Sequence, residues 1–429
     1  MMHTAGARPT PRLGLRENLA QFALLLLVNA FVGAMVGMER AILPLLAERE
    51  FGVASRTSIL SFVLTFGVVK AISNLIAGGA ADRWGRRKIL LLGWLAGLPV
   101  PVMIIMAPSW QWVVAANVLL GINQGLCWSA AIIMKVDLVG PVRRGLAIGL
   151  NEASGYLAVS LAALGSGYLA AAYGLRPFPF LIGVVAALAG LVCSLMVRET
   201  RGHALVEATT HARSGVALSF SAVFQRVSWR NRSLFSISQA GLMNNLNDGV
   251  SWGLFPLYFA SAGASLVEVA KLVALYPAVW GLAQISSGPL SDRWGRKWMI
   301  VVGMALQALA LFAIGITRET MAWTGAMIAL GLGTALVYPT FLGAISDHAH
   351  PSWRATAIGV YRLWRDLGYA LGALVAGGVA DLLGTPMAIR IVAVMTLISG
   401  VIVAAAYQET PARQKATLLS DIVPRGGSE

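Results

Sequence analysis

The chain has 429 residues, of which 57% are hydrophobic and only 12% charged, and its formal net charge is +14. Soluble domains contain about 25% charged residues, so this composition excludes an ordinary soluble domain and indicates a protein of the membrane. The two cysteines, Cys127 and Cys193, both fall in apolar runs, which excludes a disulfide framework and favours a packing role for each.

The apolar residues form continuous runs long enough for helices that cross a bilayer, which takes roughly 20 residues each. Backbone polar groups inside lipid must be hydrogen-bonded internally, and runs without alternation favour helices over a barrel. The sequence therefore predicts an all-α membrane protein with twelve transmembrane helices. In chain order, the predicted spans lie near residues 18–46, 56–80, 89–107, 111–134, 146–170, 178–197, 233–260, 267–290, 298–316, 321–345, 355–380 and 387–407.

The basic residues lie mainly in the segments that join spans on one side, including Lys135 and the stretch 198–232. Cytoplasmic loops of membrane proteins carry such an excess of Lys and Arg. We therefore expect an integral protein of the bacterial inner membrane with both termini in the cytoplasm. The positive charge is expected to set this topology and to attract anionic lipids, and nucleic acid is not an expected partner.

A short core recurs after 210 positions. Asp82-Arg83-Trp84-Gly85-Arg86-Arg87 follows the second span, and Asp292-Arg293-Trp294-Gly295-Arg296-Lys297 follows the eighth. A constant offset that extends over several spans indicates two copies of one structural unit. Further residues match at the same offset, namely Gly78 with Gly288, Asp137 with Asp347, and Arg144 with Arg354.

The repeat divides the chain into two pseudo-symmetric six-helix bundles, at residues 1–197 and 233–408. Residues 198–232 form the longest polar stretch and are predicted to be a cytoplasmic linker, with an amphipathic piece near 216–227 that suits the membrane surface. Residues 409–429 are predicted to be a cytoplasmic tail, whose end resembles the remnant of a protease site.

The first copy of the core, Gly78-x-x-x-Asp82-Arg83-x-Gly85-Arg86-Arg87, closely resembles the signature loop of the major facilitator superfamily, and the second copy is also a habit of that family. The resemblance implies a transporter whose halves rock around a central site. It also implies that this cluster latches helix 2 to helix 11 in one conformation only. The conformational latch is expected to comprise Gly78, Asp82, Arg83, Gly85, Arg86, Asp137, Arg144, Asp292, Arg293, Gly295, Arg296, Asp347 and Arg354.

The signature core also has a physical interpretation of its own. Gly78 allows a neighbouring helix to approach closely, and Gly85 permits a tight turn. Asp82 lies at the negative end of a helix dipole, where a carboxylate needs nearby cations such as Arg83 and Arg86. The alternative is that these charges are ordinary anchors at the membrane surface.

Eight charged residues fall inside the predicted spans, where each is a functional candidate because a charge in lipid is costly. Glu152 and Arg362 lie near the midplane and differ by the repeat offset, in helices 5 and 11, which face the opposite half in this superfamily. Several arrangements are open: a pair across the cavity, separate partners in each half, or a static ion pair. An anionic substrate could replace Glu152 as the partner of Arg362, or protonation of Glu152 could release the pair. The eight residues are Glu39, Arg40, Lys70, Glu152, Asp248, Arg362, Arg365 and Asp366.

Two further clusters supply candidates. Glu39-Arg40 resembles the acid–arginine pair of organic-anion/proton symporters in the superfamily, but it lies about one turn closer to the outer surface. Two roles remain possible for the pair: a gate at the lip of the cavity, or snorkelling to the membrane interface. Asp248 ends an amide-rich run on helix 7 that is expected to line the pathway. The proton-coupling candidates are Glu152, Glu39 and Asp248, and the substrate-binding candidates are Arg40, Lys70, Asn151, Arg362, Asn244, Asn247, Tyr361 and Trp280.

These residues predict a proton-coupled secondary transporter, expected to be a monomer, that moves a small anionic or zwitterionic organic solute by alternating access. The alternative is proton-driven efflux of amphiphilic drugs, which the aromatic residues inside spans favour. Against efflux, the glycine–proline element typical of helix 5 in drug/proton antiporters is missing, and Asn117 replaces their helix 4 arginine. A transport-dead receptor is a third interpretation, disfavoured by the eight retained charges.

The sequence contains no nucleophile–base constellation and no phosphate-binding loop, and no histidine falls inside a span. We therefore expect no enzymatic activity, no metal and no cofactor. An electrochemical gradient is the expected energy source, and protons suit it better than sodium because buried carboxylates can bind them.

Overall fold

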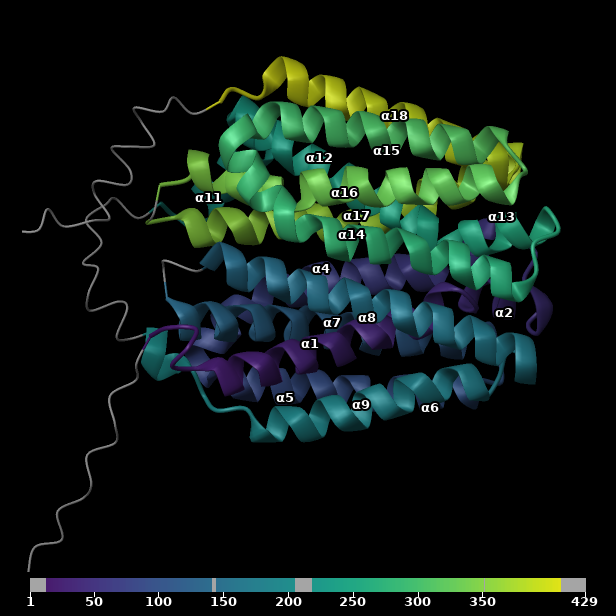
Figure 1. The fold of residues 1–429 in the computed structure, drawn as a ribbon, viewed down its shortest axis with the longest axis horizontal. Helices are drawn as coiled ribbons and strands as arrows, with labels where there is room; N and C mark the ends of the chain where they lie inside the picture. The colour runs from purple at the N-terminus through teal and green to yellow at the C-terminus, as the bar shows by residue number, and fades with distance from the viewer. Residues whose placement is uncertain (1–12, 141–143, 205–217, 351, 410–429) are drawn as a thin grey trace, which may run out of the picture.

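A computed structural model describes residues 13–140, 144–204, 218–350 and 352–409, which form helices and loops without a β-strand. Figure 1 shows two layers of long, roughly parallel helices, one for each half of the chain. The N-terminal half contains α1 (Leu19–Arg40), α2 (Leu43–Arg49), α3 (Arg56–Ile59), α4 (Ser61–Trp84), α5 (Arg86–Gly97), α6 (Pro99–Ile105), α7 (Trp110–Val139), α8 (Arg144–Tyr173) and α9 (Phe178–Met196). The second half contains α11 (Phe220–Gln225), the π-helix η2 (Arg226–Arg230), α12 (Arg232–Gly253), α13 (Phe255–Ser261), α14 (Leu266–Trp294), α15 (Arg296–Ile316), α16 (Thr320–His348), α17 (Arg354–Leu383) and α18 (Thr385–Ala406).

In the described part of the chain, 11 helical segments are long and apolar enough to cross a membrane. The remaining predicted span corresponds to α12, whose amides and Asp248 dilute its apolar content. This helix nevertheless packs along α17 and α18 within the second half. With α12 included, the structure has the predicted twelve-helix architecture.

Several predicted spans consist of two helical pieces. The first span is divided between α1 and α2, the third between α5 and α6, and the seventh between α12 and α13. Pro44, Pro99 and Pro256 each lie in the first turn of the second piece. Proline has no N–H to donate to the preceding turn, but it fits the start of a helix, so it divides the span at these positions.

Other helices run beyond the predicted spans. α4 ends at Gly85, with φ of 99°, and α14 ends at Gly295, with φ of 89°, so Asp82 and Asp292 lie in the last helical turns. Only glycine adopts this backbone conformation readily, which explains why the helices end there. Lys135, which was assigned to a loop, instead lies buried in α7 and donates to the carbonyl of Leu25 at 2.8 Å.

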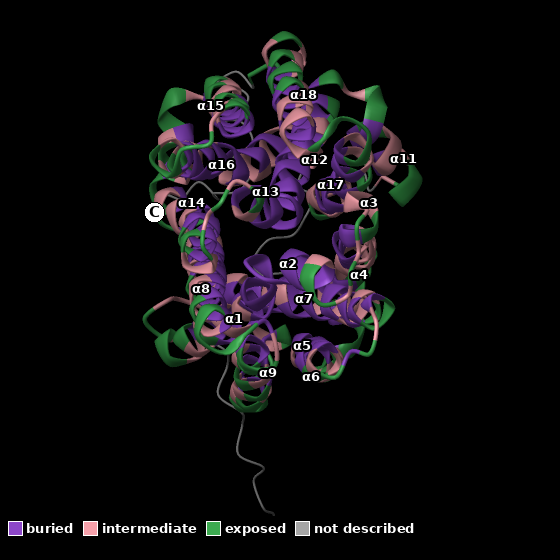
Figure 2. Ribbon diagram, turned by 90° about the vertical axis from the view of Figure 1, so that its right-hand side faces the viewer, coloured by how far each residue is buried: buried purple, intermediate pink, exposed green. Residues whose placement is uncertain are grey.

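The two halves meet along two helix pairs, α8 with α14 and α4 with α17, on either side of the interface (Figure 2). Within the first half, α1 packs so closely on α8 that a Cβ at Gly33 would overlap the carbonyl of Gly155. Small residues permit this close approach between membrane helices. The interface is therefore framed by two helices from each half, with α1 supporting one of them.

The halves are joined tightly at one end, which we call the closed end. There the carboxylate of Asp381 on α17 accepts hydrogen bonds from the backbone N–H groups of Arg56 at 2.5 Å and Thr57 at 3.0 Å. The opposite end, which carries the repeated loops, is called the loop end. Among the described residues, no atom of another helix lies within 4 Å of a Cβ built on Gly78 or Gly288, so these residues do not make the close helix approach expected at Gly78.

Candidate functional site

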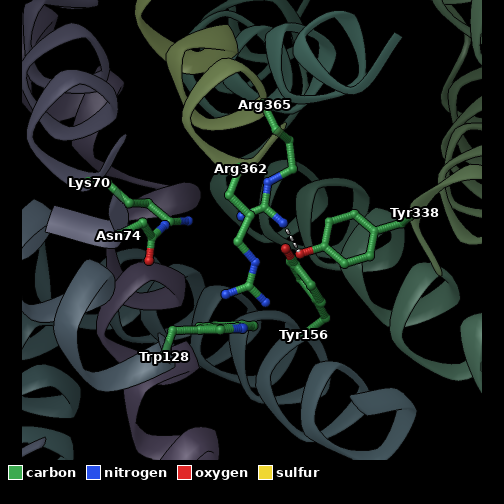
Figure 3. Close-up of a pocket in the computed structure, with 7 residues that line it drawn as sticks. All are labelled: Lys70, Asn74, Trp128, Tyr156, Tyr338, Arg362 and Arg365. Atoms are coloured by element: carbon green, nitrogen blue, oxygen red, sulfur yellow. Dashed lines mark hydrogen bonds between the residues drawn. The ribbon is translucent and has the colours of Figure 1, made fainter. Parts of the chain in front are cut away.

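A small pocket lies at the interface between the halves, where α4, α7 and α8 face α16 and α17 (Figure 3). Its wall combines three cations with aromatic rings and one amide. Because both halves contribute, rocking of the halves would open or close this pocket. The lining residues are Lys70, Asn74, Trp128, Tyr156, Tyr338, Arg362 and Arg365.

Two of the three cations have no carboxylate partner in the described part of the chain. The guanidinium of Arg362 extends into the pocket between Trp128 and the two tyrosines (Figure 3), and its buried Nε has no hydrogen-bond partner. Lys70 is surrounded by rings, with its Nζ 5.1 Å from the centre of Tyr369 and 5.3 Å from that of Phe66. Among the described residues, no acid lies within 4.0 Å of either cation. Their charges are therefore available to an anion.

The third cation, Arg365, is neutralised inside the protein. It forms an ion pair with the adjacent Asp366 at 2.7 Å and donates to the hydroxyl of Tyr338 at 2.6 Å. Asp366 also accepts hydrogen bonds from Asn74 and Asn245. The two neighbours in sequence thus bond to each other, although adjacent helical positions lie about 100° apart. This network fixes the tyrosine and the amide that line the pocket.

Glu152 does not line the pocket itself but is hydrogen-bonded to Trp128, which does, and it is 3% exposed. Its Oε1 accepts from the indole of Trp128 at 2.8 Å and from Asn151 at 3.0 Å, whereas its Oε2 is buried without a partner. Among the described residues, Glu152 and Arg362 form no ion pair with each other: the carboxylate accepts from Trp128 and Asn151 of its own half, and the guanidinium faces the pocket. Both ions are held apart in this conformation.

A second ionic cluster crosses the interface nearer the closed end, and we call it the outer bridge. Arg40 of α1 contacts both carboxylate oxygens of Asp248 on α12, at 2.6 and 2.8 Å, and both side chains are buried. The hydroxyl of Tyr369 donates to the same carboxylate at 2.6 Å. Since the ring of Tyr369 also faces Lys70, one side chain on α17 joins the outer bridge to the pocket.

The other predicted residues lie around these two clusters. Glu39 is fully buried next to Arg40 of the outer bridge; its carboxyl group neighbours the side chain of Asn117 and has no ion-pair partner among the described residues. Trp280 stacks behind Tyr156 with ring centres 3.5 Å apart, so it supports the pocket without lining it. Asn247 bonds to Gln307 and Thr396 inside the second half. Asn244 and Tyr361 are buried and also do not line the pocket.

Of the substrate-binding candidates, the structure therefore brings Lys70 and Arg362 into the pocket. Sequence reasoning did not assign five lining residues to the site: Asn74, Trp128, Tyr156, Tyr338 and Arg365. For Asn74 a signal existed, since it is a polar residue in a span and matches Gln284 at the repeat offset. Trp128 and Tyr338 also carried a signal, as aromatic residues inside spans that suit an amphiphilic solute, but a ring inside a span is equally suited to packing, so this signal did not select them.

The sequence profile of the Major Facilitator Superfamily matches residues 25–245 and 237–422. This chain belongs to that superfamily. It is therefore an integral membrane transporter. The multidrug resistance protein MdtG of Enterobacter lignolyticus (strain SCF1) is 24% identical over 392 residues, which cover 89% of this chain and 90% of that protein. MdtG of Salmonella arizonae (strain ATCC BAA-731 / CDC346-86 / RSK2980) is 27% identical over 316 residues, which cover 71% of this chain and 74% of that protein.

Solved structures of other transporters share the fold. A POT family transporter in complex with 5-aminolevulinic acid superposes with a TM-score of 0.74 at 15% identity, covering 92% of this chain and 97% of that one. A mutant of the nucleoside transporter NupG gives a TM-score of 0.70 at 14% identity, and the match covers 90% of this chain and 100% of that one. At these identities the likeness concerns the fold alone.

The superfamily signature loop forms the same ionic cluster in both halves of this transporter. Arg86 bonds to Asp82 at 3.0 Å and to Asp137 at 2.9 Å. Arg296 bonds to Asp292 at 2.5 Å and to Asp347 at 3.3 Å. Each arginine thus begins a helix, α5 or α15, and joins the end of the preceding helix to the end of the following long span, α7 or α16, of its own half. The bonds just described lie within one half each, so the latch between helices 2 and 11 stays a prediction.

The remaining latch candidates lie around these clusters. Arg83 and Arg293 are exposed, whereas Arg144 and Arg354 begin α8 and α17. A further pair was missed: Glu199 accepts from the backbone N–H groups of Arg86 and Arg87, and Glu409 accepts from that of Lys297. These two glutamates also differ by the repeat offset. In each half, therefore, a glutamate that follows the last span accepts hydrogen bonds from the backbone of the repeated loop.

Replacing Asp137 with asparagine is expected to destabilise the transporter far more than replacing Asp82 with asparagine. Asp137 is a buried partner of Arg86 and also accepts from Thr200, so its loss leaves a buried cation poorly paired, at about 3 kcal/mol. Asp82 is 73% exposed, and an exposed pair contributes about 0–1 kcal/mol. Thermal unfolding of the purified variants measures the difference, and equal losses in Tm would contradict this account of the cluster.

Proposed function

We propose that this transporter couples a small organic anion or zwitterion with a carboxylate to protons, both moving in the same direction. One observation carries the proposal: among the described residues, Arg362 and Lys70 present two charges without carboxylate partners in a pocket whose Trp128 is hydrogen-bonded to Glu152. The planar guanidinium of an arginine suits a carboxylate, which it binds through two parallel hydrogen bonds. The pocket is thus suited to an anionic group.

Glu152 supplies the coupling in this proposal. When it is deprotonated, its negative charge favours the nearby cations and repels an anionic substrate. When it is protonated, the two cations attract the anion more strongly. Proton and anion therefore promote each other's binding, and such coupling is reciprocal by thermodynamic necessity. Joint loading and joint release across an alternating interface is symport.

The proposed orientation places the loop end and both termini in the cytoplasm of a bacterial cell, with the protein in the inner membrane as a monomer. Basic residues of the repeated loops and of the linker support this orientation. The closed end then faces outward, and the described conformation is one in which the outer path is shut by the outer bridge.

Efflux of amphiphilic compounds is the second candidate. The rings of Trp128, Tyr156 and Tyr338 in the pocket favour it, as do the two relatives named multidrug resistance proteins. Against it, a cationic amphiphile would meet two unneutralised cations. The electrostatics of the pocket therefore favour an anion over the cation typical of drug/proton antiport.

The two candidates give opposite results in proteoliposomes with an imposed pH gradient. We expect radiolabelled organic carboxylates to accumulate on the side toward which protons flow, and a protonophore to abolish the accumulation. The lipophilic cation tetraphenylphosphonium serves as the matched probe, and its carrier-mediated movement should be absent. Movement of the cation against the proton flow, with no carboxylate uptake, would establish efflux and overturn the proposal.

A further inference from the structure

The segment just before α12 has an exposed face that is both aromatic and basic. α11 and η2 together span residues 220–230, and Val223 and Val227 hold them to the protein with their buried side chains. On the outside, Phe220 is 53% exposed and Trp229 is 57% exposed. Three arginines are exposed on the same segment and at the start of α12, namely Arg226, Arg230 and Arg232.

No described carboxylate neutralises the charge of this face. Residues 208–247 contain no Asp or Glu. Within the described ranges, no carboxylate lies within 4.0 Å of Arg226, Arg230 or Arg232; the nearest notable contact is Arg226 over the ring of Trp353, at 5.5 Å. In contrast, Arg86 and Arg296 of the repeated loops each bond to two aspartates. The face is therefore suited to an anionic partner.

The same segment contacts the helix that carries the pocket arginines. The indole of Trp364 on α17 donates to the hydroxyl of Ser228 at 2.9 Å, and its ring lies 6.3 Å from that of Phe224. Trp364 stands between Arg362 and Arg365 in the sequence of α17. A ligand on the exposed face thus acts on a segment that is bonded to this turn of α17.

We propose that α11 and η2 bind the headgroup of an anionic phospholipid, and that the bound lipid holds this segment against α17. Aromatic side chains such as Phe220 and Trp229 prefer the boundary between headgroups and acyl chains. Arginines bind phosphate through several hydrogen bonds and are attracted to anionic leaflets. The combination at the start of a membrane span favours a lipid over an acidic protein, which would not need the exposed rings. The inference is independent of the proposed substrate.

Quenching of tryptophan fluorescence by brominated lipids tests the binding in proteoliposomes. The chain has 13 tryptophans, so the Trp229 component is taken as the difference from a Trp229→Phe variant. In a phosphatidylcholine bilayer, brominated phosphatidylglycerol should quench this component several-fold more than the same fraction of brominated phosphatidylcholine. The excess should disappear at high salt, which screens exposed charges.

The variant carrying Arg226→Gln, Arg230→Gln and Arg232→Gln should lose the excess quenching. A matched control, Arg198→Gln with Arg201→Gln, removes two exposed arginines from another part of the linker and should retain it. Equal quenching by the two lipids in the unmodified protein, or an excess that survives the triple substitution, would overturn the lipid site. The salt titration decides the question even if the triple variant does not fold.

Hydrogen exchange tests the connection to α17. Phosphatidylglycerol should slow exchange of the α17 amides next to Trp364 in the unmodified protein, and the effect should be lost in Trp364→Phe, which keeps a ring but cannot donate to Ser228. Exchange that is insensitive to the lipid, while quenching shows that the lipid is bound, would contradict the claim that the lipid holds the segment against α17.

Discussion

Replacing Glu152 with glutamine is expected to abolish accumulation driven by a pH gradient while leaving substrate exchange intact. One coupled proton supports about a tenfold accumulation for each unit of pH difference, since one pH unit corresponds to about 1.36 kcal/mol. The amide oxygen of glutamine can still accept from Trp128 and Asn151, so the local structure is kept. The side chain then resembles the protonated acid permanently and carries no proton across the membrane.

The measurement compares uphill uptake with counterflow in proteoliposomes that hold equal amounts of the two proteins. Glu39→Gln is the informative companion, because Glu39 is another buried carboxyl but lies beside the outer bridge rather than the pocket. Loss of accumulation in the Glu152 variant alone assigns coupling to the pocket. Unchanged accumulation in that variant would refute the role of Glu152, and loss in the Glu39 variant alone would move the role to Glu39.

Replacing Asp248 with asparagine is expected to shift the transporter strongly toward a second conformation, in which the end that is closed in this structure has opened. Arg40 is 1% exposed in the outer bridge and would lose its anionic partner while it stays buried. Breaking a buried pair in this way costs about 3–5 kcal/mol, which changes the balance of conformations by about a hundredfold or more. Opening this end allows water to reach Arg40 and relieves the cost.

The shift can be measured by cysteine labelling. The only two cysteines, Cys127 and Cys193, are first replaced by alanine, and Ser251→Cys then reports on α12 one turn beyond Asp248, where Ser251 is buried. A membrane-impermeant maleimide should label this site much faster in the Asp248→Asn background. Equal labelling rates in the two backgrounds would contradict the gating role.

Two matched variants separate charge from packing at the outer bridge. Arg40→Gln combined with Asp248→Asn removes both charges and should restore slow labelling, because no buried ion is left unpaired. Tyr369→Phe removes one hydrogen bond to Asp248 but keeps the ring that faces Lys70, so it should have a smaller effect. Tyr276→Phe is its control, because the Tyr276 hydroxyl bonds to Thr334 instead of the bridge.

The ion pair of the outer bridge could not be predicted from the sequence. Arg40 and Asp248 were each candidates, but for different roles, one for substrate and one for protons. They are 208 residues apart and do not match at the repeat offset, so no pattern in the chain joins them. Their contact depends on how α1 and α12 lie against each other at the interface. Only the packed halves could reveal that these charges neutralise each other.

Glu152 and Arg362 illustrate the opposite case. The repeat offset predicted equivalent positions in the two halves, and both residues lie at or next to the pocket. The offset could not predict their rotamers. Trp128 and Asn151 draw the carboxylate to one side, while the guanidinium of Arg362 stays in the pocket. Equivalent positions therefore hold functionally different groups whose orientation is set by neighbours from other helices.

The sequence by itself determined the membrane class, the helical spans, the two repeated halves and the pairing of Asp82 with Arg86 in the repeated loop. These features follow from local quantities, namely the apolar length of each run, the conformational freedom of glycine, and the spacing of charges along one helix. The tertiary structure decided which helix faces meet at the interface, which cations stay unneutralised, and which end is closed. Those properties depend on side chains from both halves at once, because a buried charge is paired or free only in relation to residues far away in the chain.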